Sequence, residues 1–181
     1  LELGGVVRAV LDIATEQARC GVDVTLATHD ATDVPADFPG NVLVLPGPGP
    51  LGRLGPGSAK AAPVVSRMDA VHLHGMWSLA NLQWADFAKE ANCPYFISPH
   101  GMLDNWCMNQ KAFKKNLFLR IGGRRWLEHA CGVHLTATAE QEQSRRWAPK
   151  MRSFVCPLPM DMAPFQQIPS RELAEKAEPA Y

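Results

Sequence analysis

The sequence has no long hydrophobic run and no excess of charge of either sign. Its longest apolar runs fall well short of the roughly 18 to 20 residues that a membrane helix needs, and no signal-peptide pattern opens it. Lys+Arg and Asp+Glu both total 18, so no global charge attracts nucleic acid or an anionic surface. We therefore expect a cytoplasmic protein that binds no nucleic acid, with any attraction to a charged surface being local.

Regular cysteine spacing and the P-loop signature are also absent. The five cysteines are odd in number, scattered and free of any C-x-x-C pair, which favours reduced, mostly packed thiols over disulfides or a zinc knot. No G-x-x-x-x-G-K-[ST] occurs, so a P-loop interpretation loses its main support.

What the sequence does contain is a regular alternation of strand-like and helix-like segments. A length of 181 residues suits one domain, and 46% hydrophobic residues are enough for a core. Strands separated by helices imply right-handed crossovers, so we predict an α/β, Rossmann-like, doubly wound and mostly parallel sheet with helices on both faces. Helices are expected at 6–20, 78–91, 111–120, 124–130 and 139–147, and strands at 22–28, 41–45, 70–73, 95–98, 133–137 and 153–156.

The first of these helices is amphipathic, and the segment at 46–63 interrupts the alternation. The apolar face predicted for the helix consists of Val6, Val7, Val10, Ile13, Ala14 and Ala18. The run Pro46–Pro63 is so rich in proline and glycine that we predict a mobile surface loop there.

Two short apolar runs end in the same way, in a histidine followed by a glycine. His74-Gly75 closes the run that begins at Val71, and His100-Gly101 follows Ser98-Pro99. Parallel sheets bind ligands beyond the carboxyl ends of their strands, where a histidine can donate, accept or carry a proton. The pattern predicts one shared ligand site at this edge.

The histidines admit a second interpretation, as metal ligands. His72 and His74 lie two apart in a strand, so both rings face the same side of the sheet, and His100 could supply a third ligand. Alternatively, one of the two is a hydrogen-bonded core residue and the other approaches the rim. Asp69 and Asp104 are available nearby, but each more simply caps a turn or a helix.

Two further features of the sequence can be interpreted either as functional or as purely structural. Gly4-Gly5 directly precedes the first helix, where free N–H groups could seat a diphosphate, although such a pair is also a common turn. The segment 111–126 mixes Lys and Arg with large apolar residues, which suits either contact with anionic lipid or a solvated helix face. We expect ordinary surface charges at Glu140, Glu142, Arg145 and Arg146.

Taken in order, these segments resemble the N-terminal domain of group 1 (family 4) glycosyltransferases, from about Leu3 to Phe165. Ser98-Pro99-His100-Gly101-Met102-Leu103-Asp104 is the most specific match. The others are Leu3-Gly4-Gly5, Gly21-Val22-Asp23-Val24-Thr25, Asp69-Ala70-Val71-His72-Leu73-His74-Gly75, Lys114-Lys115 and Thr136-Ala137-Thr138-Ala139-Glu140.

The resemblance implies the N-terminal half of a GT-B architecture and a sugar transfer from a nucleotide donor with retention, without a metal or other cofactor. By this similarity Gly4 and Gly5 would meet the donor diphosphate, and His100 would act beside the reacting sugar. His74 and Gly75 would line the acceptor side, and Gly101 and Met102 would also contact substrate. The leaving diphosphate can itself accept the acceptor's proton. The implied setting is bacterial polysaccharide biosynthesis, in the cytoplasm or peripheral at the inner membrane, with a glycan or lipid-linked acceptor.

The resemblance also divides the chain. Residues 1–165 would form the acceptor-side domain and 166–181 a linker toward a donor-binding domain, so that this chain is inactive alone. After Cys156-Pro157 the sequence continues Leu158-Pro159 where relatives have Asn-Gly, which alters the interdomain hinge. Relatives also have a strand directly before the Gly-Gly loop, and we expect a corresponding segment ahead of Leu1.

Two functions of other classes stay open. A metal-dependent hydrolase would use His72, His74 and His100 as ligands. A non-catalytic α/β binding module would use residues 111–126 as its contact surface.

Overall fold

The chain folds into alternating strands and helices whose order confirms the predicted α/β class. The computed structural model describes residues 4–160, so the predicted linker at 166–181 lies outside the described residues. The strands are β1 (Thr25–Thr28), β2 (Asn41–Val44), β3 (Val71–His74), β4 (Tyr95–Ser98), β5 (Gly132–Leu135) and β6 (Ser153–Val155). The helices are α1 (Gly5–Arg19), α2 (Ser58–Val65), α3 (Leu79–Glu90), α4 (Asn105–Asn109), α5 (Ala112–Phe118), α6 (Arg124–His129) and α7 (Thr138–Arg145), with short turns η1 (Pro50–Gly52) and η2 (Gly55–Gly57) and a π-helical turn η3 (Leu119–Gly123).

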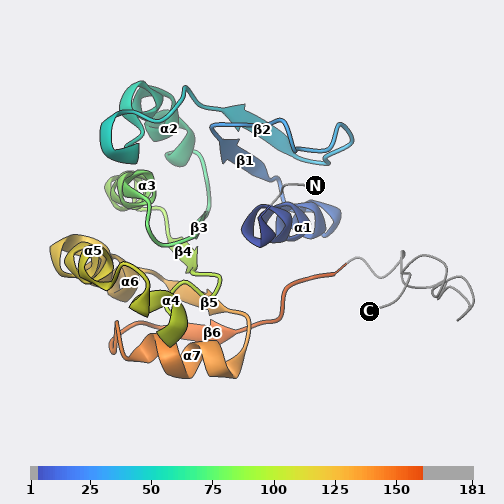
Figure 1. Ribbon diagram of the computed structural model, residues 1–181. Helices are drawn as coiled ribbons and strands as arrows, with labels where there is room; N and C mark the ends of the chain where they lie inside the picture. Colours follow the sequence, from blue (N-terminus) through green and yellow to red (C-terminus); the bar gives the residue numbers. More distant parts are fainter. Residues whose placement is uncertain (1–3, 161–181) are drawn as a thin grey trace, which may run out of the picture.

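All strand pairs in the described chain are parallel, but they form two sheets. β1 pairs with β2, and β3, β4, β5 and β6 form a four-stranded sheet in that order. Figure 1 shows α1 on one side of the larger sheet and α3, α5 and α6 on the other. The helices therefore cover both faces, as expected of a doubly wound domain.

The main core lies between the larger sheet and the helices opposite α1. Leu73, Ile97 and Val133 point to this face and are at most 5% exposed. They pack with Trp126 and Leu127 of α6. A smaller cluster under β2 contains Leu45, Leu54, Ala61 and Ala80.

The segment Pro46–Pro63 is more structured than predicted. It contains η1, η2 and the start of α2, and Leu54 is fully buried. The Leu54 N–H donates to Gln83 Oε1 of α3 at 2.7 Å. Burial of the Leu54 side chain and the bond to its N–H hold this segment against α3, and the expectation of a loop over the whole of 46–63 is wrong because α2 begins at Ser58.

The thiol prediction is also partly wrong. All five cysteines are free, as expected, but only Cys93 is buried and Cys107 half-buried. Cys20, Cys131 and Cys156 are exposed because they lie just beyond the ends of α1, α6 and β6, outside the core. Within residues 4–160, no helix is long and apolar enough to cross a membrane.

Candidate functional site at the carboxyl edge of the sheet

The carboxyl ends of β3 and β4 lie side by side and end in backbone that bends sharply. His74 of β3 is in register with Ser98 of β4. Gly75 and Gly101 have φ of 80° and 73°, and His100 has φ of 54°. Glycine accepts this left-handed region freely, whereas a histidine there is strained. Strained residues of this kind cluster at ligand sites, so His100 marks the edge as a candidate site.

The structure brings His74 and His100 into direct contact. His74 Nδ1 and His100 Nε2 are 3.0 Å apart, and the two rings stack with centroids 5.3 Å apart. Asn81 of α3 donates to the carbonyls of His74 and Gly75 at 2.9 and 3.2 Å. Asn81 of α3 therefore holds the end of β3 in place, and His74 at this end holds the His100 ring through their hydrogen bond.

Gly75 and Met102 also lie together, as the shared-site prediction requires. The Met76 N–H lies 3.2 Å from Met102 Sδ, a weak acceptor. A Cβ added at Gly75 would lie 3.4 Å from Met102 Cε, so glycine permits this close approach.

Glu140 organises the site and was missed by the sequence analysis. We expected a surface charge, but the residue is 6% exposed. One carboxylate oxygen accepts the Gly101 N–H at 2.7 Å, and the other accepts the N–H and hydroxyl of Thr136 at 2.7 and 2.9 Å. Glu140 thus joins the loops that follow β4 and β5. A threonine four residues before a glutamate, at the start of a helix, was the sequence signal that could have predicted the hydrogen bond between Thr136 and Glu140.

His72 belongs to a separate hydrogen-bonded chain inside the sheet. Its Nε2 lies 2.8 Å from Ser98 Oγ, and Ser98 Oγ lies 2.9 Å from His134 Nδ1. His134 Nε2 lies 2.7 Å from the Cys156 carbonyl. A carbonyl only accepts, so His134 donates from Nε2, Ser98 donates to its Nδ1, and His72 donates to Ser98. Of the two interpretations offered for the strand histidines, this geometry fits the hydrogen-bonded core residue.

Burial favours the neutral form of three of the histidines, His72, His74 and His100. Desolvation lowers the pKa of His72 to about 4, with a further contribution from His134 and His100. Desolvation also holds the pKa of His74 well below its usual value. The pKa of His100 is lowered by burial, although the nearby Glu140 carboxylate opposes the shift. His74 and His100 therefore share one proton in their hydrogen bond at neutral pH.

The histidine nitrogens are directed at hydrogen-bond partners rather than at a common point. His72 bonds Ser98, whereas His74 bonds His100. Across residues 4–160, no three His, Cys, Asp or Glu side chains are grouped as a metal site would need.

Asp104 starts α4 but does not cap it through its side chain. It occupies the N-cap position without a side-chain hydrogen bond, and its Oδ1 is buried without a partner in the structure. Burial and the neighbouring Glu140 charge raise the pKa of Asp104. A Cβ at Gly101 would lie 3.3 Å from Asp104 Oδ2. The capping role expected for this residue is therefore wrong, because the carboxyl group points toward the His100 loop. Asp69 is exposed, at the turn before β3.

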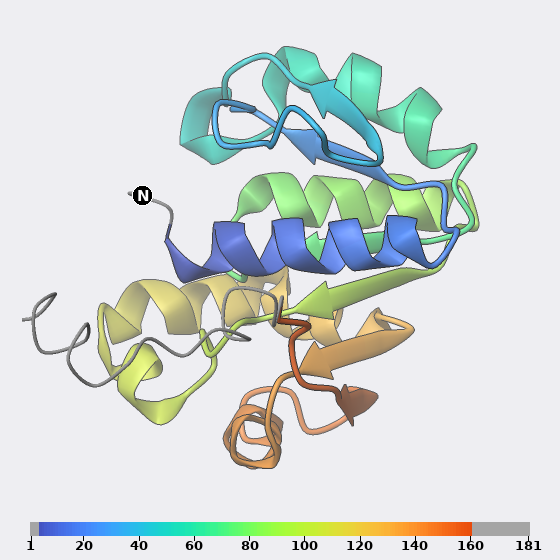
Figure 2. The same cartoon turned by 90° about the vertical axis from the view of Figure 1, so that its right-hand side faces the viewer.

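The start of α1 lies at the same end of the sheet. Figure 2 shows the N-terminal end of α1 at the edge where β4 leads into α4. Gly4 and Gly5 are exposed, and a Cβ at either position would meet nothing within 4 Å. Gly4 makes no side-chain cap and the first turn carries no acidic residue, so the helix N-terminus is open to an anion.

The segment predicted as a contact surface combines core and exposed residues. Trp126 is 2% exposed and belongs to the core, which corrects its assignment to a surface. Phe113 and Ile121 are 80% and 77% exposed. The outer side of α5 and η3 is therefore apolar and open.

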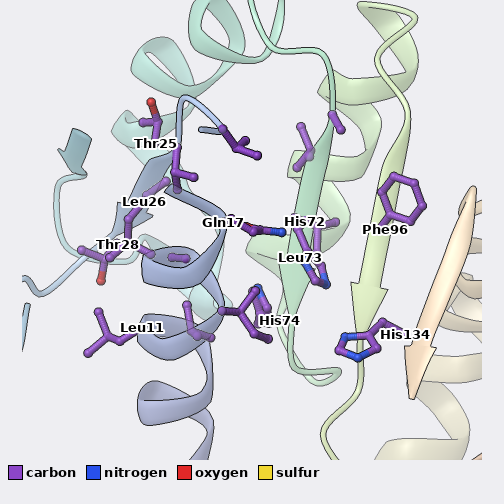
Figure 3. Close-up of a pocket in the computed structure, with 18 of the residues that line it drawn as sticks. Leu11, Gln17, Thr25, Leu26, Thr28, His72, Leu73, His74, Phe96 and His134 are labelled. Carbon is purple, nitrogen blue, oxygen red and sulfur yellow. The ribbon is translucent and has the colours of Figure 1, made fainter. Parts of the chain in front are cut away.

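A cavity in the described part of the chain is lined by His74 but not by His100. It has a volume of about 1080 Å³ and lies between β1 and β3, beneath α1. Figure 3 shows Leu26, His72 and His74 around it. Neither His100 nor the Gly4-Gly5 pair lines it, so cavity size alone does not locate the candidate site.

A parallel sheet with helices on both faces defines a Rossmann-like domain, and comparisons with known proteins narrow this class. The Anabaena protein HepE, solved in complex with UDP-glucose, matches with a TM-score of 0.71 at 17% sequence identity. The match covers 97% of this chain and 47% of that one, so the chain spans about half the length of HepE. This likeness shows the GT-B type of fold.

The family follows from the sequence itself. The profile of the glycosyl transferase 4-like domain matches residues 4–158, and the chain therefore belongs to this family. This confirms the family expected from the motifs. No curated protein matches significantly.

Proposed function

We propose that this chain is the acceptor-side part of an enzyme that transfers a sugar, with retention, from a nucleotide-sugar donor to a glycan or lipid-linked acceptor. The observation that carries the proposal is the contact between His74 and His100 at the carboxyl edge, within a chain whose residues 4–158 match the glycosyl transferase 4-like domain. HepE, of similar fold, was solved with UDP-glucose.

In this proposal His100 is the catalytic residue and its neighbours position it. The hydrogen bond to His74 occupies Nε2, which leaves Nδ1 for a sugar or acceptor hydroxyl. Because burial lowers its pKa, the ring is neutral at neutral pH and can donate or accept without carrying charge. The left-handed backbone and the Glu140 bond to Gly101 hold the ring at the rim.

The remaining site residues would bind substrate. Gly4 and Gly5 would let the donor diphosphate approach the N-terminus of α1, where N–H groups and the helix dipole favour an anion. Gly75, Gly101 and Met102 would shape the acceptor side, because their close packing determines how near a sugar ring can come. No metal or further cofactor is part of this proposal.

The test uses the full-length enzyme with both domains. His100→Ala should lower turnover by roughly 100-fold or more while changing the unfolding temperature little, as expected for a group that acts on the reacting atoms. His29→Ala is a matched control, because His29 lies on the β1 side and bonds Pro46. Equal turnover in His100→Ala and parent would remove His100 from the mechanism. Sugar transfer by residues 1–181 alone would contradict the two-domain assignment.

Metal analysis separates this proposal from the hydrolase alternative. Stoichiometric zinc or manganese in the purified protein, lost on His72→Ala or His74→Ala, would favour a hydrolase. Protein that transfers sugar after exhaustive chelation would favour the transferase.

A peripheral membrane contact through α5 and η3 is a second part of the proposal. Phe113, Leu117 and Ile121 recur every four residues and are exposed by 80%, 46% and 77%, while Trp106 of α4 is 76% exposed nearby. Lys111, Lys114, Arg120 and Arg125 are exposed beside them, and no acidic residue occurs between 105 and 127. Apolar side chains flanked by cations fit an anionic bilayer surface, which would bring a lipid-linked acceptor to the site.

Vesicle binding tests this surface. The protein should sediment with phosphatidylglycerol vesicles, less so at high salt, and weakly with phosphatidylcholine alone. Phe113→Ser with Ile121→Ser should abolish the binding, whereas Leu51→Ser, at an 86% exposed site elsewhere, should not change it. Binding that ignores both salt and the double substitution would exclude the contact. The bacterial cytoplasmic setting, with the inner membrane as the surface, is part of the proposal on the family resemblance alone.

A further inference from the structure

The side chains of Cys107, in α4, and Lys115, in α5, lie in contact. Lys115 Nζ is 3.2 Å from Cys107 Sγ and donates to the Cys107 carbonyl at 2.5 Å. Both residues are half-buried. The other thiol contacts in the described chain, at Cys93 and Cys156, are with backbone carbonyls. Cys107 therefore differs from those two thiols in having a side-chain amine as its neighbour.

Neighbouring aromatic rings hold Lys115 close to the sulfur. Lys115 Nζ lies 5.2 Å from the centroid of the Trp77 ring, whose face attracts a cation. Trp77 packs edge-on against Phe118 of α5, with ring centroids 5.6 Å apart. Among residues 4–160, none of the salt bridges involves Lys115. No carboxylate therefore draws the amine away from Cys107.

The backbone of α4 fixes the position of the thiol. The Gln110 N–H donates to the Cys107 carbonyl at 3.0 Å, and the Met108 N–H donates to the Asp104 carbonyl at 2.8 Å. Met108, the next residue, is 1% exposed and anchors the helix in the core. Cys107 itself is only half-buried, so a small oxidant can reach its sulfur. The structure thus holds an accessible thiol and an amine within contact distance of each other.

We propose that Cys107 and Lys115 form a sulfenamide bridge when the protein meets hydrogen peroxide, which makes this pair an oxidation-sensitive link between α4 and α5. In the first step peroxide oxidises the thiol to a sulfenic acid: an S–O bond forms, the O–O bond breaks and water leaves. In the second step the Lys115 ammonium passes one proton to solvent, and the amine nitrogen attacks sulfur. The N–S bond forms, the S–O bond breaks, and the hydroxyl leaves as water with a second amine proton. Sulfur loses the two electrons that peroxide gains.

The bridge would join two helices with different positions in the molecule. α4 follows the loop from His100 to Asp104, and α5 carries the exposed side chains of Phe113 and Leu117. A covalent link would fix one helix against the other and remove the positive charge that lies over the Trp77 ring. Dithiothreitol would reverse it, because its two thiols become a disulfide while the thiol and the amine are restored. This inference does not depend on the proposed sugar transfer.

Peptide mapping of the full-length protein tests the bridge. The protein is treated with hydrogen peroxide, its remaining thiols are blocked with N-ethylmaleimide, and it is digested with trypsin. The expected product is peptide 90–111 joined to peptide 115–120, with the summed mass less two hydrogens. Trypsin should not cut after the modified Lys115, and fragment spectra should place the link at Cys107. Dithiothreitol added before digestion should remove the linked peptide.

Two lysine variants separate the bridge from simple oxidation of the thiol. Lys115→Arg keeps a positive charge but supplies a guanidinium that stays protonated and does not attack sulfur. This variant should form no bridge, and dimedone should capture roughly fivefold or more sulfenic acid at Cys107 than in the parent protein. Lys114→Arg, at an exposed position of the same helix, is the matched control and should form the bridge as the parent does.

Three outcomes would overturn the proposal. The first is the absence of the linked peptide from the parent, and the second is equal dimedone capture in the parent and Lys115→Arg. The third is a link from Cys107 to Lys114 as frequent as the link to Lys115, because the reaction would then reflect closeness along the chain. Peroxide added in denaturing urea should give several times less bridge, and an equal yield there would also overturn the proposal.

Discussion

The two sheets of this domain show how neighbouring elements determine stability in an α/β fold. In the closed half, β3 to β6 with their helices, the strand residues of β5 are all buried. In the open half, β1 and β2, no strand residue is buried and Val42 and Val44 are 40% and 50% exposed. Both halves follow the same strand-helix alternation. The difference lies in the number of neighbours, because a strand becomes a core element only when it is flanked on both sides.

The largest difference between the halves is expected in the stability lost when an apolar strand residue is cut back to alanine. Ile97→Ala removes a fully buried side chain from β4 and should lower the free energy of unfolding by roughly 2–5 kcal/mol, through lost burial and the cavity left behind. Leu26→Ala, in half-buried β1, should cost only about 1 kcal/mol. Urea unfolding measures both, and similar costs would erase the distinction between the halves.

The pH dependence of stability should come from the closed half. His72 has a folded pKa of about 4 against an ordinary 6.5, so below pH 6.5 the unfolded chain binds a proton that the folded chain refuses. Stability should therefore fall as the pH drops from 6.5 toward 4, by at most on the order of 3 kcal/mol from this group, and should not depend on this group above 6.5. The shifts of His74 and His100 act in the same direction.

Urea unfolding between pH 5 and 7.5 checks the sign. His72→Gln should flatten the slope, because it removes the ring that takes up a proton on unfolding. A parent protein that becomes more stable toward pH 5 would contradict the assignment of neutral buried rings.

The side-chain hydrogen bonds that join neighbouring loops should contribute more to the free energy of unfolding in the closed half than in the open half. Glu140 joins the β4 and β5 loops through three hydrogen bonds, so Glu140→Gln should cost roughly 1–3 kcal/mol and speed amide exchange at Gly101. His29 joins the β1 and β2 loops through one bond to the Pro46 carbonyl, and His29→Ala should cost less than about 1 kcal/mol. Glu142→Gln, exposed on the same helix as Glu140, is the matched control, and an equal loss there would mean that charge alone matters.

The smallest expected difference is between the stability costs of substituting two glycines that have positive φ. Gly101→Ala and Gly52→Ala both place a side chain in the left-handed region, at a cost of about 1 kcal/mol each. Gly101→Ala should cost a few tenths more, because its Cβ lies 3.3 Å from Asp104 Oδ2, while nothing lies within 4 Å at Gly52. Thermal unfolding of the pair measures the contact, and a reversed order would show that the Asp104 carboxyl moves away without cost.

Much of the fold was predictable from local patterns. The apolar run after the Cys93-Pro94 stop predicted β4 at Tyr95–Ser98, the bounds that the structure shows. Ser78 predicted the start of α3, and its side chain accepts the Asn81 N–H at 3.3 Å. The paired His-Gly endings predicted that residues 74 and 100 lie at one edge of the sheet, and the structure places their rings in contact there. These features depend on neighbours in sequence or on the rule that parallel strands end at one edge.

Other features depended on contacts between distant segments. Glu140 has the composition of a surface helix, and only the loop after β4 makes it a buried acceptor. Leu54 is buried because it packs with Leu45 and Ala80, and Gln83 of α3 accepts its N–H. The composition of the 46–63 segment indicates neither contact. Asp104 fails as a cap for the same reason, because its carboxyl packs toward Gly101.

By itself, then, the sequence determined the alternation of elements, the family and the pair of histidines at one edge, because periodicity and short motifs are local properties. Only the tertiary structure decided which histidine is a core residue, which glutamate is buried and where the sheet divides. Burial and hydrogen bonding belong to pairs of residues far apart in the chain, and they exist only after those residues are brought together.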